Sequence, residues 1–257
     1  MRRITIFAYG VACYAVFFAT FLYAAGFVGG FLAPTSLDGP RSRPLGEALA
    51  IDAALLALFA LQHSVMARPA FKRWWTRFVP EPAERSTYVL FSSLALVLLF
   101  GFWEPLGGTV WHVDHPAGRA VLWAIFASGW LMVLVSTFLI NHFDLFGLRQ
   151  VWLYLRGREY TPLRFRTPGP YRLVRHPLYV GWLTAFWATP TMTAGHLFFA
   201  LAMTAYILVA IRYEERDLLS YFGNAYAEYR RRVPMLVPRP CRPTPTAAGP
   251  PLAAPRA

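Results

Sequence analysis

A series of long apolar stretches constrains this chain more than any other feature. Each uninterrupted stretch approaches or exceeds the roughly 20 residues that a helix needs to cross the hydrocarbon core of a bilayer. Four of them cover residues 4–32, 45–66, 86–103 and 119–141, and a further apolar block covers 178–212. With 56% hydrophobic residues and a mean hydropathy of +0.39, the chain is too apolar for an ordinary soluble domain. It is predicted to be an all-α polytopic membrane protein with about five to six transmembrane helical segments.

The last apolar block has a break in its middle. It is interrupted at Thr189-Pro190 and again around Gly195, so its first arm has only about a dozen residues, which is short for a full crossing. The two arms therefore predict a helical hairpin, or one crossing with a short partner. Gly223 is expected to end the second helix.

Basic residues are distributed unevenly between the connecting segments, and the formal net charge is +12. If the spans alternate in direction, the two termini and the segments 67–85 and 143–175 share one side, and they hold nearly all the arginines. The segments 33–44 and 104–118 fall on the other side. The positive-inside rule then predicts that both termini are cytoplasmic. It also explains the basic charge through a bilayer partner rather than through nucleic acid.

Cysteine usage offers no framework for a disulfide or a metal. Cys13 lies in an apolar span and Cys241 in the C-terminal tail, and no histidine, cysteine or aspartate cluster has the spacing of metal ligands. No glycine-rich phosphate loop follows a predicted strand, which excludes a Rossmann-type cofactor site. No feature indicates an obligate protein partner.

The loop at 169–182 carries the densest set of polar and conformationally special residues. Pro170 and Pro177 fix the backbone at two points, and a proline such as Pro177 is typical of the first position of a helix. His176 should therefore sit at a helix mouth, where free backbone N–H groups favour an anion. Arg172 and Arg175 add cationic donors. The loop predicts a polar pocket next to a membrane-embedded helix.

The segments Arg175–Trp182 and Glu214–Leu218, which bracket the apolar hairpin, resemble the integral-membrane methyltransferases typified by isoprenylcysteine carboxyl methyltransferase. The resemblance continues through Gly223, Tyr226, Tyr229 and Val233-Pro234. Upstream, three further segments look like the bacterial methanethiol S-methyltransferase branch of that family: His63–Pro69, Glu84–Tyr88 and Asn141–Gln150. The match covers most of the chain.

This resemblance implies an enzyme that methylates a small volatile thiol, turning methanethiol into dimethyl sulfide. It implies S-adenosyl-L-methionine as the methyl donor, S-adenosyl-L-homocysteine as the product, and in-line transfer at a membrane-embedded site. It also implies one integral-membrane domain at 1–237, with cofactor binding in about 141–237, in a multi-pass protein of a bacterial inner membrane. Residues 238–257 form a Pro/Ala-rich tail that is expected to be disordered.

Two groups of residues are expected to bind the cofactor. Glu214 or Glu215 can accept hydrogen bonds from the ribose hydroxyls or the ammonium, while Arg175, His176 and the helix mouth can take the carboxylate. Aromatic side chains can cover the adenine. The full predicted set is Tyr171, Arg175, His176, Pro177, Tyr179, Gly181, Trp182, Glu214 and Glu215. The structural alternative is that the glutamates form salt bridges with Arg212 or Arg216 and the aromatics form an interface belt.

The nucleophile must be a thiolate, since a neutral thiol reacts poorly. The sulfonium can lower the pKa of the thiol, and a base can take its proton. The candidates for this base are His142 and Asp144, at the end of the fourth span, and His63; the alternative is that these residues cap helix ends. Asp52, inside the second span, is expected to make a structural bond to Asn141, to Arg119 or to a backbone group.

The acceptor pocket is expected to be small and closed, with a wall drawn from Phe143, Phe146, Trp182 and Phe186. Two alternatives remain at this point. One is a methyltransferase for a lipidic acceptor, such as an isoprenyl thiol, a prenylcysteine carboxylate or a phospholipid amine. The other is a non-enzymatic membrane protein of the nitrite or nitric-oxide-associated type, which shares the Arg-His-Pro segment; the intact Glu214-Glu215 pair weighs against it.

Overall fold

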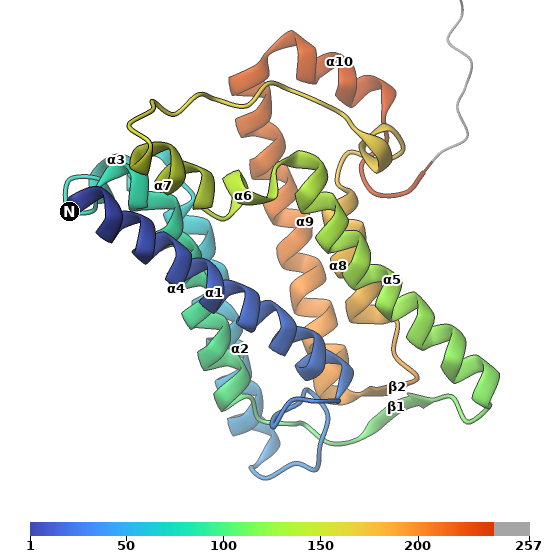
Figure 1. Ribbon diagram of the computed structural model, residues 1–257. Helices are drawn as coiled ribbons and strands as arrows, with labels where there is room; N and C mark the ends of the chain where they lie inside the picture. Colours follow the sequence, from blue (N-terminus) through green and yellow to red (C-terminus); the bar gives the residue numbers. More distant parts are fainter. Residues whose placement is uncertain (239–257) are drawn as a thin grey trace, which may run out of the picture.

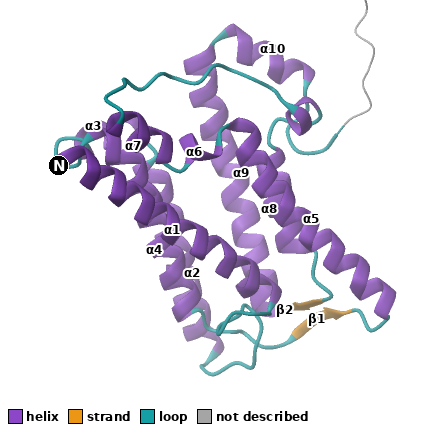
Figure 2. Ribbon diagram, in the orientation of Figure 1, coloured by secondary structure: helices purple, strands orange, loops and turns teal. Residues whose placement is uncertain are grey.

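Five long helices form the body of the protein, which is described here by a computed structural model over residues 1–238 (Figure 1). All five are long and apolar enough to cross a membrane. They are α1 (Arg2–Gly29), α2 (Leu45–Met66), α4 (Glu81–Phe102), α5 (Pro116–Ile140) and α9 (Ala194–Phe222). Helices account for most of the structure (Figure 2). The prediction of an all-α polytopic membrane protein is confirmed, while the predicted disordered tail lies outside the described residues except for Pro238.

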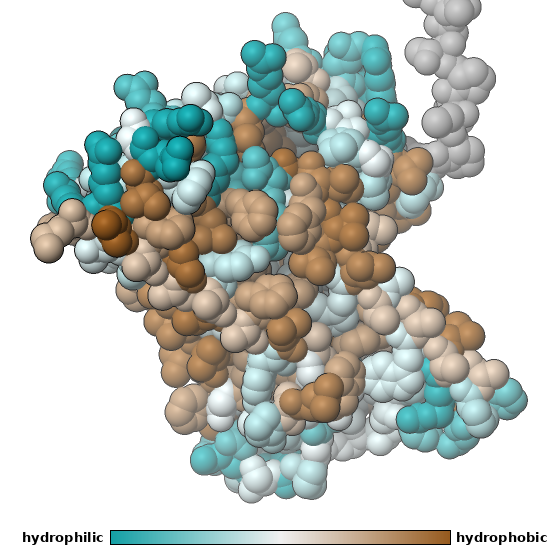
Figure 3. Space-filling model, in the orientation of Figure 1, coloured by the Kyte–Doolittle hydropathy of each residue, from teal (hydrophilic) through white to brown (hydrophobic). Residues whose placement is uncertain are grey.

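Shorter helices and most of the arginine-rich segments gather at the end of the bundle that holds the N-terminus (Figure 1). The short elements are α3 (Pro69–Trp75), α6 (His142–Leu145), α7 (Leu148–Leu155), the 3-10 turn η1 (Gly169–Arg172) and α10 (Asn224–Arg232). Figure 3 shows hydrophilic side chains at both ends of the molecule and an apolar band between them. Such a band is what a bilayer requires of a spanning bundle.

The predicted hairpin is present, with arms of unequal length. Its first arm, α8 (Pro177–Trp187), has 11 residues and its second arm is α9, which has 29. The break at Thr189-Pro190 falls in the turn between them, as the sequence indicates. Gly223 adopts a positive φ of 56° directly after α9, so the prediction that it ends this helix is also confirmed.

A two-stranded ribbon at the far end of the bundle was not predicted. Its strands are β1 (Thr109–His112) and β2 (Thr191–Thr193), which pair in antiparallel fashion. The ribbon joins the loop before α5 to the turn of the hairpin. Four and three residues are too few to show the alternation that marks a strand in sequence, which explains why both segments read as loops.

Two buried polar side chains anchor the same far end. One carboxylate oxygen of Asp52 accepts a hydrogen bond from the backbone N–H of Glu104 at 2.9 Å, which confirms the expected structural role and ties α2 to the end of α4. His196, at the start of α9, bonds through Nε2 to the carbonyl oxygen of Phe186 at 2.9 Å. Its Nδ1 lies 3.5 Å from the Asp38 carboxylate. These bonds fix the hairpin turn against the neighbouring loops.

The first arm of the hairpin is held against α5 by two glycines. A Cβ at Gly181 would lie 2.8 Å from the backbone oxygen of Gly129, and a Cβ at Gly129 would lie 2.7 Å from the backbone nitrogen of Ala185. Such distances leave no room for a side chain. The two helices therefore pack backbone against backbone, in the manner of small-residue contacts between membrane helices.

Candidate active site

The start of α8 is held by the segment that follows α10. The backbone N–H of Arg175 donates to the carbonyl oxygen of Pro234 at 2.8 Å, and that of His176 donates to Met235 at 3.2 Å. Pro177 occupies the first turn of α8, so His176 lies at the helix mouth as predicted. The C-terminal segment thus closes over the loop at 169–176 and places both polar side chains.

A buried ion cluster, formed by Arg175, His176 and Glu215, lies below this loop. Glu215 Oε1 is 2.7 Å from Arg175 Nε and 3.1 Å from His176 Nε2. The exposed fractions of the three side chains are 11%, 4% and 12% in chain order. Arg175 also donates to the backbone oxygens of Arg230 and Val233, at 3.1 and 2.6 Å. The cluster therefore links three parts of the chain: the start of α8, the last part of α9, and the backbone at the end of α10.

Glu214 differs from its neighbour in having a more accessible carboxylate. Its side chain is 44% exposed, and its Oε2 lies 3.9 Å from His176 Nδ1. The hydroxyl of Tyr179 lies beside the same carboxylate. Of the two glutamates, Glu215 is committed to protein partners, whereas Glu214 retains acceptor capacity for a ligand.

Three tyrosines surround the ion cluster from η1 and α10. Tyr229 donates its hydroxyl hydrogen to the backbone oxygen of Tyr171 at 2.6 Å. The hydroxyls of Tyr171 and Tyr226 are buried and have no hydrogen-bond partner within residues 1–238. Burial raises the pKa of Tyr171 and of Tyr226, and it raises that of Tyr229 to about 12, so all three remain protonated donors at neutral pH. Two unpartnered buried donors next to the glutamates are an unusual feature that a polar ligand would explain.

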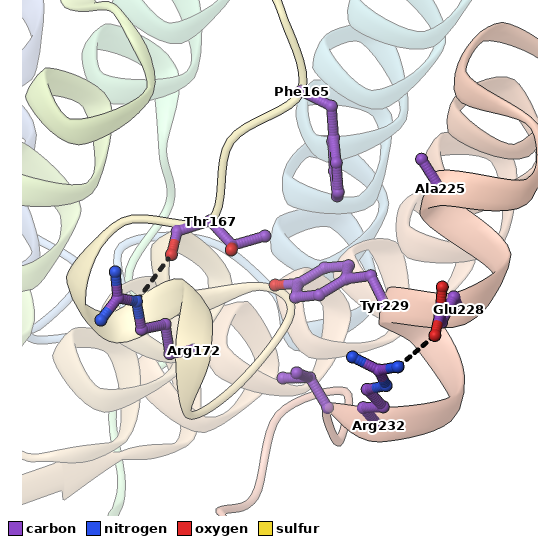
Figure 4. A pocket seen from close by; sticks show the side chains of 8 residues that line it. Phe165, Thr167, Arg172, Ala225, Glu228, Tyr229 and Arg232 are labelled. Carbon is purple, nitrogen blue, oxygen red and sulfur yellow. Dashed lines mark hydrogen bonds and ion pairs between the residues drawn. The ribbon is translucent and has the colours of Figure 1, made fainter. Parts of the chain in front are cut away.

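Tyr229 also lines an open cavity of about 300 Å³ (Figure 4). Its wall combines aromatic, basic and small residues: Phe165, Thr167, Arg172, Ala225, Glu228, Tyr229, Arg232 and Val233. Within it, Arg172 donates to the backbone oxygen of Thr167, and Arg232 forms an ion pair with Glu228. The sequence analysis missed this cavity, because the segment before η1 and α10 meet only in the folded chain.

Gly181 and Trp182 belong to the apolar side of α8. Gly181 makes the close backbone contact with α5, and as a glycine it has no side chain that could contact a ligand. The Trp182 indole packs at ring-centroid distances of 5.1 Å from Trp130, 6.1 Å from Phe21 and 5.6 Å from Phe186. Trp182 is therefore part of an aromatic cluster that reaches from α8 to α1 and α5.

The four aromatic residues predicted for the acceptor wall do not all lie in this cluster. Trp182 and Phe186 stack on each other, and Phe146 joins the same run of rings through Phe17, 3.8 Å away. Phe143 is 51% exposed, and its ring packs beside those of Phe138 and His142 at centroid distances of 6.2 and 5.5 Å, so its place in the wall stays a prediction. One turn of α6 separates the two phenylalanines, and only the fold decides which of them faces inward.

His142 and Asp144 have structural partners at the N-terminal side of α7. His142 is 2% exposed, and its ring nitrogens contact the hydroxyls of Tyr14 and Thr137, each at 2.8 Å. Burial lowers the pKa of His142, which keeps it neutral. Asp144 pairs with Arg149 at 2.8 Å. Within residues 1–238, no hydrogen bond or ion pair joins either residue to the ion cluster.

His63, the third candidate base, lies in a network between α2 and α4. Its Nε2 is 2.9 Å from the Tyr88 hydroxyl, and its Nδ1 is 3.1 Å from Ser92 Oγ. As for His142 and Asp144, no hydrogen bond or ion pair in the described part of the chain joins His63 to the ion cluster.

Comparison with known proteins gives several long matches. The chain is 58% identical to a methanethiol S-methyltransferase of Crocosphaera subtropica over 238 residues, which are 93% of each chain. It is 54% identical to the methanethiol S-methyltransferase of Mycobacterium tuberculosis over 95% of this chain and the whole of that relative. It is 33% identical to nurim of Rattus norvegicus over 69% of this chain and 71% of nurim. No family model and no solved structure matches.

Proposed function

Because this chain belongs to the methanethiol S-methyltransferase family, and is therefore a methyltransferase with a thiol acceptor, we propose that it methylates methanethiol with S-adenosyl-L-methionine to give dimethyl sulfide. The observation that carries the proposal is the agreement between this membership and the ion cluster of Arg175, His176 and Glu215. The cluster unites the two sequence motifs on either side of the hairpin, next to a second carboxylate that is free to bind a ligand.

The residues around the ion cluster fit the polar groups of S-adenosylmethionine. Glu214 can accept hydrogen bonds from the ribose hydroxyls or pair with the ammonium. The hydroxyls of Tyr171 and Tyr226, which have no partner in the described part of the chain, can donate to the carboxylate or to an adenine nitrogen. Arg175 and His176 are held at the helix mouth, where a carboxylate is favoured. The bound cofactor would supply an electrophilic methyl group that the thiolate takes by in-line displacement.

The protein's own contribution is to exclude water and to orient the acceptor. Methanethiol offers one sulfur and one methyl group, and binding is limited to about 1.5 kcal/mol per heavy atom, so recognition alone gives little. The rate enhancement must come from holding the thiol in line with the methyl group and from excluding water from the site. The aromatic cluster around Trp182 and Phe186 supplies bulk for that purpose.

The proposal is tested by relative kcat/KM for methanethiol, a butyl thiol and a prenyl thiol in one detergent preparation. A small closed pocket is expected to lose about five- to 150-fold between methanethiol and the butyl thiol, since overpacking by extra methylenes costs about 1–3 kcal/mol. Activity that rises with chain length would contradict the small-thiol acceptor and favour a lipidic one.

We also propose that the membrane orientation places both termini in the cytoplasm of a bacterial cell. The arginine-rich loops at 67–85 and 143–175 then face the cytoplasm, and the ribbon of β1 and β2 faces the opposite side. Reporter fusions after Val79 and after Val113 are expected to give opposite locations, with the first inside. Equal locations for the two fusions would rule this topology out.

A further inference from the structure

An open groove between α1 and the start of α4 lies apart from the candidate active site. It has a volume of about 290 Å³, and it is found at the end of the bundle that holds the N-terminus (Figure 1). It shares no lining residue with the cavity of Figure 4. Its lining includes Thr5, Ile6 and Tyr9 of α1, Val79 before α4, and Ala83 and Thr87 of α4.

The hydroxyl hydrogens in this groove are already committed to partners within the protein. Thr87 Oγ1 donates to the backbone oxygen of Ala83 at 2.8 Å. The Tyr9 hydroxyl, 3.0 Å from Thr87 Oγ1, therefore donates its own hydrogen to that oxygen. Thr5 Oγ1 donates to the backbone oxygen of Met1 at 3.3 Å. Because a polar ligand would find no free hydroxyl donor here, the groove suits an apolar occupant such as a hydrocarbon chain.

The groove continues onto the lipid-facing side of α4. From Ala83 and Thr87, steps of four and three residues lead along the same helix face to Phe91 and Leu94. These two side chains are 42% and 44% exposed, and they belong to a helix that is long and apolar enough to cross the membrane. Their exposed surface therefore faces lipid tails. An acyl chain can lie in the groove and continue along α4.

Two arginines without acidic partners flank the mouth of the groove. Arg2 lies three residues before Thr5 on α1, which is about one helical turn, and Arg77 lies two residues before Val79. Both arginines are exposed. No ion pair within residues 1–238 includes either of them. A phosphate group at this mouth would meet two cations that are free to pair with it.

The charge around the mouth is positive even when its acids are counted. Residues 1–9 and 73–84 together hold four arginines against Glu81 and Glu84. α1 and α4 both begin at this end, so the positive ends of their dipoles also favour an anion. Lipid tails are as apolar as the groove, and an acyl chain gains little free energy by entering it. The groove therefore sets where a lipid lies, and the headgroup charge sets which lipid binds.

We propose that this groove binds one anionic phospholipid. An acyl chain lies along Tyr9 and Thr87, and the phosphate lies beside Arg2 and Arg77. The bound lipid joins α1 to α4 at the membrane surface. This site is separate from the one proposed for methyl transfer, and it takes a ligand of a different class.

Native mass spectrometry tests the headgroup preference. The purified full-length protein is mixed with equal amounts of phosphatidylglycerol and phosphatidylcholine that carry the same acyl chains. Wild type is expected to retain one phosphatidylglycerol with a preference of about 25-fold, since each arginine near an anionic headgroup contributes about fivefold. Arg2→Gln/Arg77→Gln should lose this preference. Arg164→Gln/Arg166→Gln removes the same charge from exposed positions in the loop before η1 and should keep it.

A second pair of variants tests the groove itself. Thr5→Phe places a ring in the groove from an exposed position and should reduce the retention of phosphatidylglycerol about tenfold. The reason is that a lipid whose chain is excluded from the groove cannot hold its phosphate at both arginines. Ala8→Phe adds the same ring to an exposed position of α1 outside the groove and should leave retention unchanged. The Tm of each variant without added lipid should equal that of wild type, which shows that the variants fold.

Three results would overturn the proposal. The first is equal retention of the two lipids by wild type, or an unchanged preference in Arg2→Gln/Arg77→Gln. The second is displacement of phosphatidylglycerol by an equal concentration of inorganic phosphate, which would show that the arginines bind an anion without its hydrocarbon chain. The third is a lipid-free dimer that Thr5→Phe converts to a monomer, which would place a second copy of the chain in the groove. None of these results bears on methyl transfer, which is measured separately.

Discussion

Replacement of Glu215 by alanine is expected to weaken the binding of S-adenosylhomocysteine by at least about 100-fold. The substitution leaves the guanidinium of Arg175 and the ring of His176 without their carboxylate partner, and these side chains are only 11% and 4% exposed. Breaking a buried pair by removing one partner costs about 3–5 kcal/mol of the free energy that keeps the loop ordered. A ligand that binds only the ordered loop must supply this free energy, and every 1.4 kcal/mol is about tenfold in affinity. The loss arises because Arg175 then no longer holds the loop before α8 in place.

Two other carboxylates near the end of α9 serve as comparisons. Glu214→Ala removes a half-exposed group and is expected to cost about tenfold through the loss of a charge-assisted ligand contact. Asp217→Ala breaks a surface pair with Arg68, which is worth about 0–1 kcal/mol, and should leave binding unchanged. Calorimetry on the three variants gives the order. Wild-type affinity in a folded Glu215→Ala protein would place the cofactor elsewhere.

Gly181→Leu is expected to reduce kcat by about 100-fold while also lowering stability. A Cβ at this position would lie 2.8 Å from the backbone oxygen of Gly129 and from the backbone nitrogen of Val133, so α8 must move away from α5. Because α8 begins directly after His176, this movement displaces the residues at its N-terminus that we propose to bind the cofactor. A misplacement of about 1 Å can cost about 100-fold in rate, and overpacking costs about 1–3 kcal/mol.

Gly101→Leu is the matched control for that prediction. A Cβ at Gly101, on α4, would meet no atom of residues 1–238 within 4 Å, so the larger side chain projects away from the rest of the bundle. Its kcat and Tm should equal those of wild type in the same detergent. A Gly181→Leu protein with normal kcat would show that the backbone contact between α5 and α8 does not position the site.

Hydropathy alone predicts much of this fold, because a membrane-spanning helix is apolar along nearly all of its length and so stands out in the sequence. The bounds of α2 coincide with the predicted span at 45–66, and the break in the final block coincides with the turn before α9. α4 begins earlier than predicted, at Glu81, because its first turn is polar. Pro80 lies at the N-cap and Pro82 within the first turn. Apolar content defines the buried part of a helix, whereas its polar first turn leaves no trace in a hydropathy pattern.

The candidate site was less predictable, because its geometry depends on partners far apart in the chain. Motif spacing brought together Arg175, His176 and Glu215, which lie in one cluster. It did not indicate that the backbone after α10 pairs with this loop, nor that the hydroxyl of Tyr226 is buried without a partner among residues 1–238. His142 illustrates the same limit: its position in sequence suggests a base, and its two hydrogen bonds come from α1 and α5.

The central claim is that this protein transfers the methyl group of S-adenosylmethionine to methanethiol. The most direct measurement offers the purified protein unlabelled methanethiol and S-adenosylmethionine with a deuterated methyl group, and follows dimethyl sulfide and S-adenosylhomocysteine together. We expect singly labelled dimethyl sulfide in equal amount to S-adenosylhomocysteine, with both products falling together in Glu215→Ala. Dimethyl sulfide without the label, or S-adenosylhomocysteine formed without dimethyl sulfide, would contradict the claim.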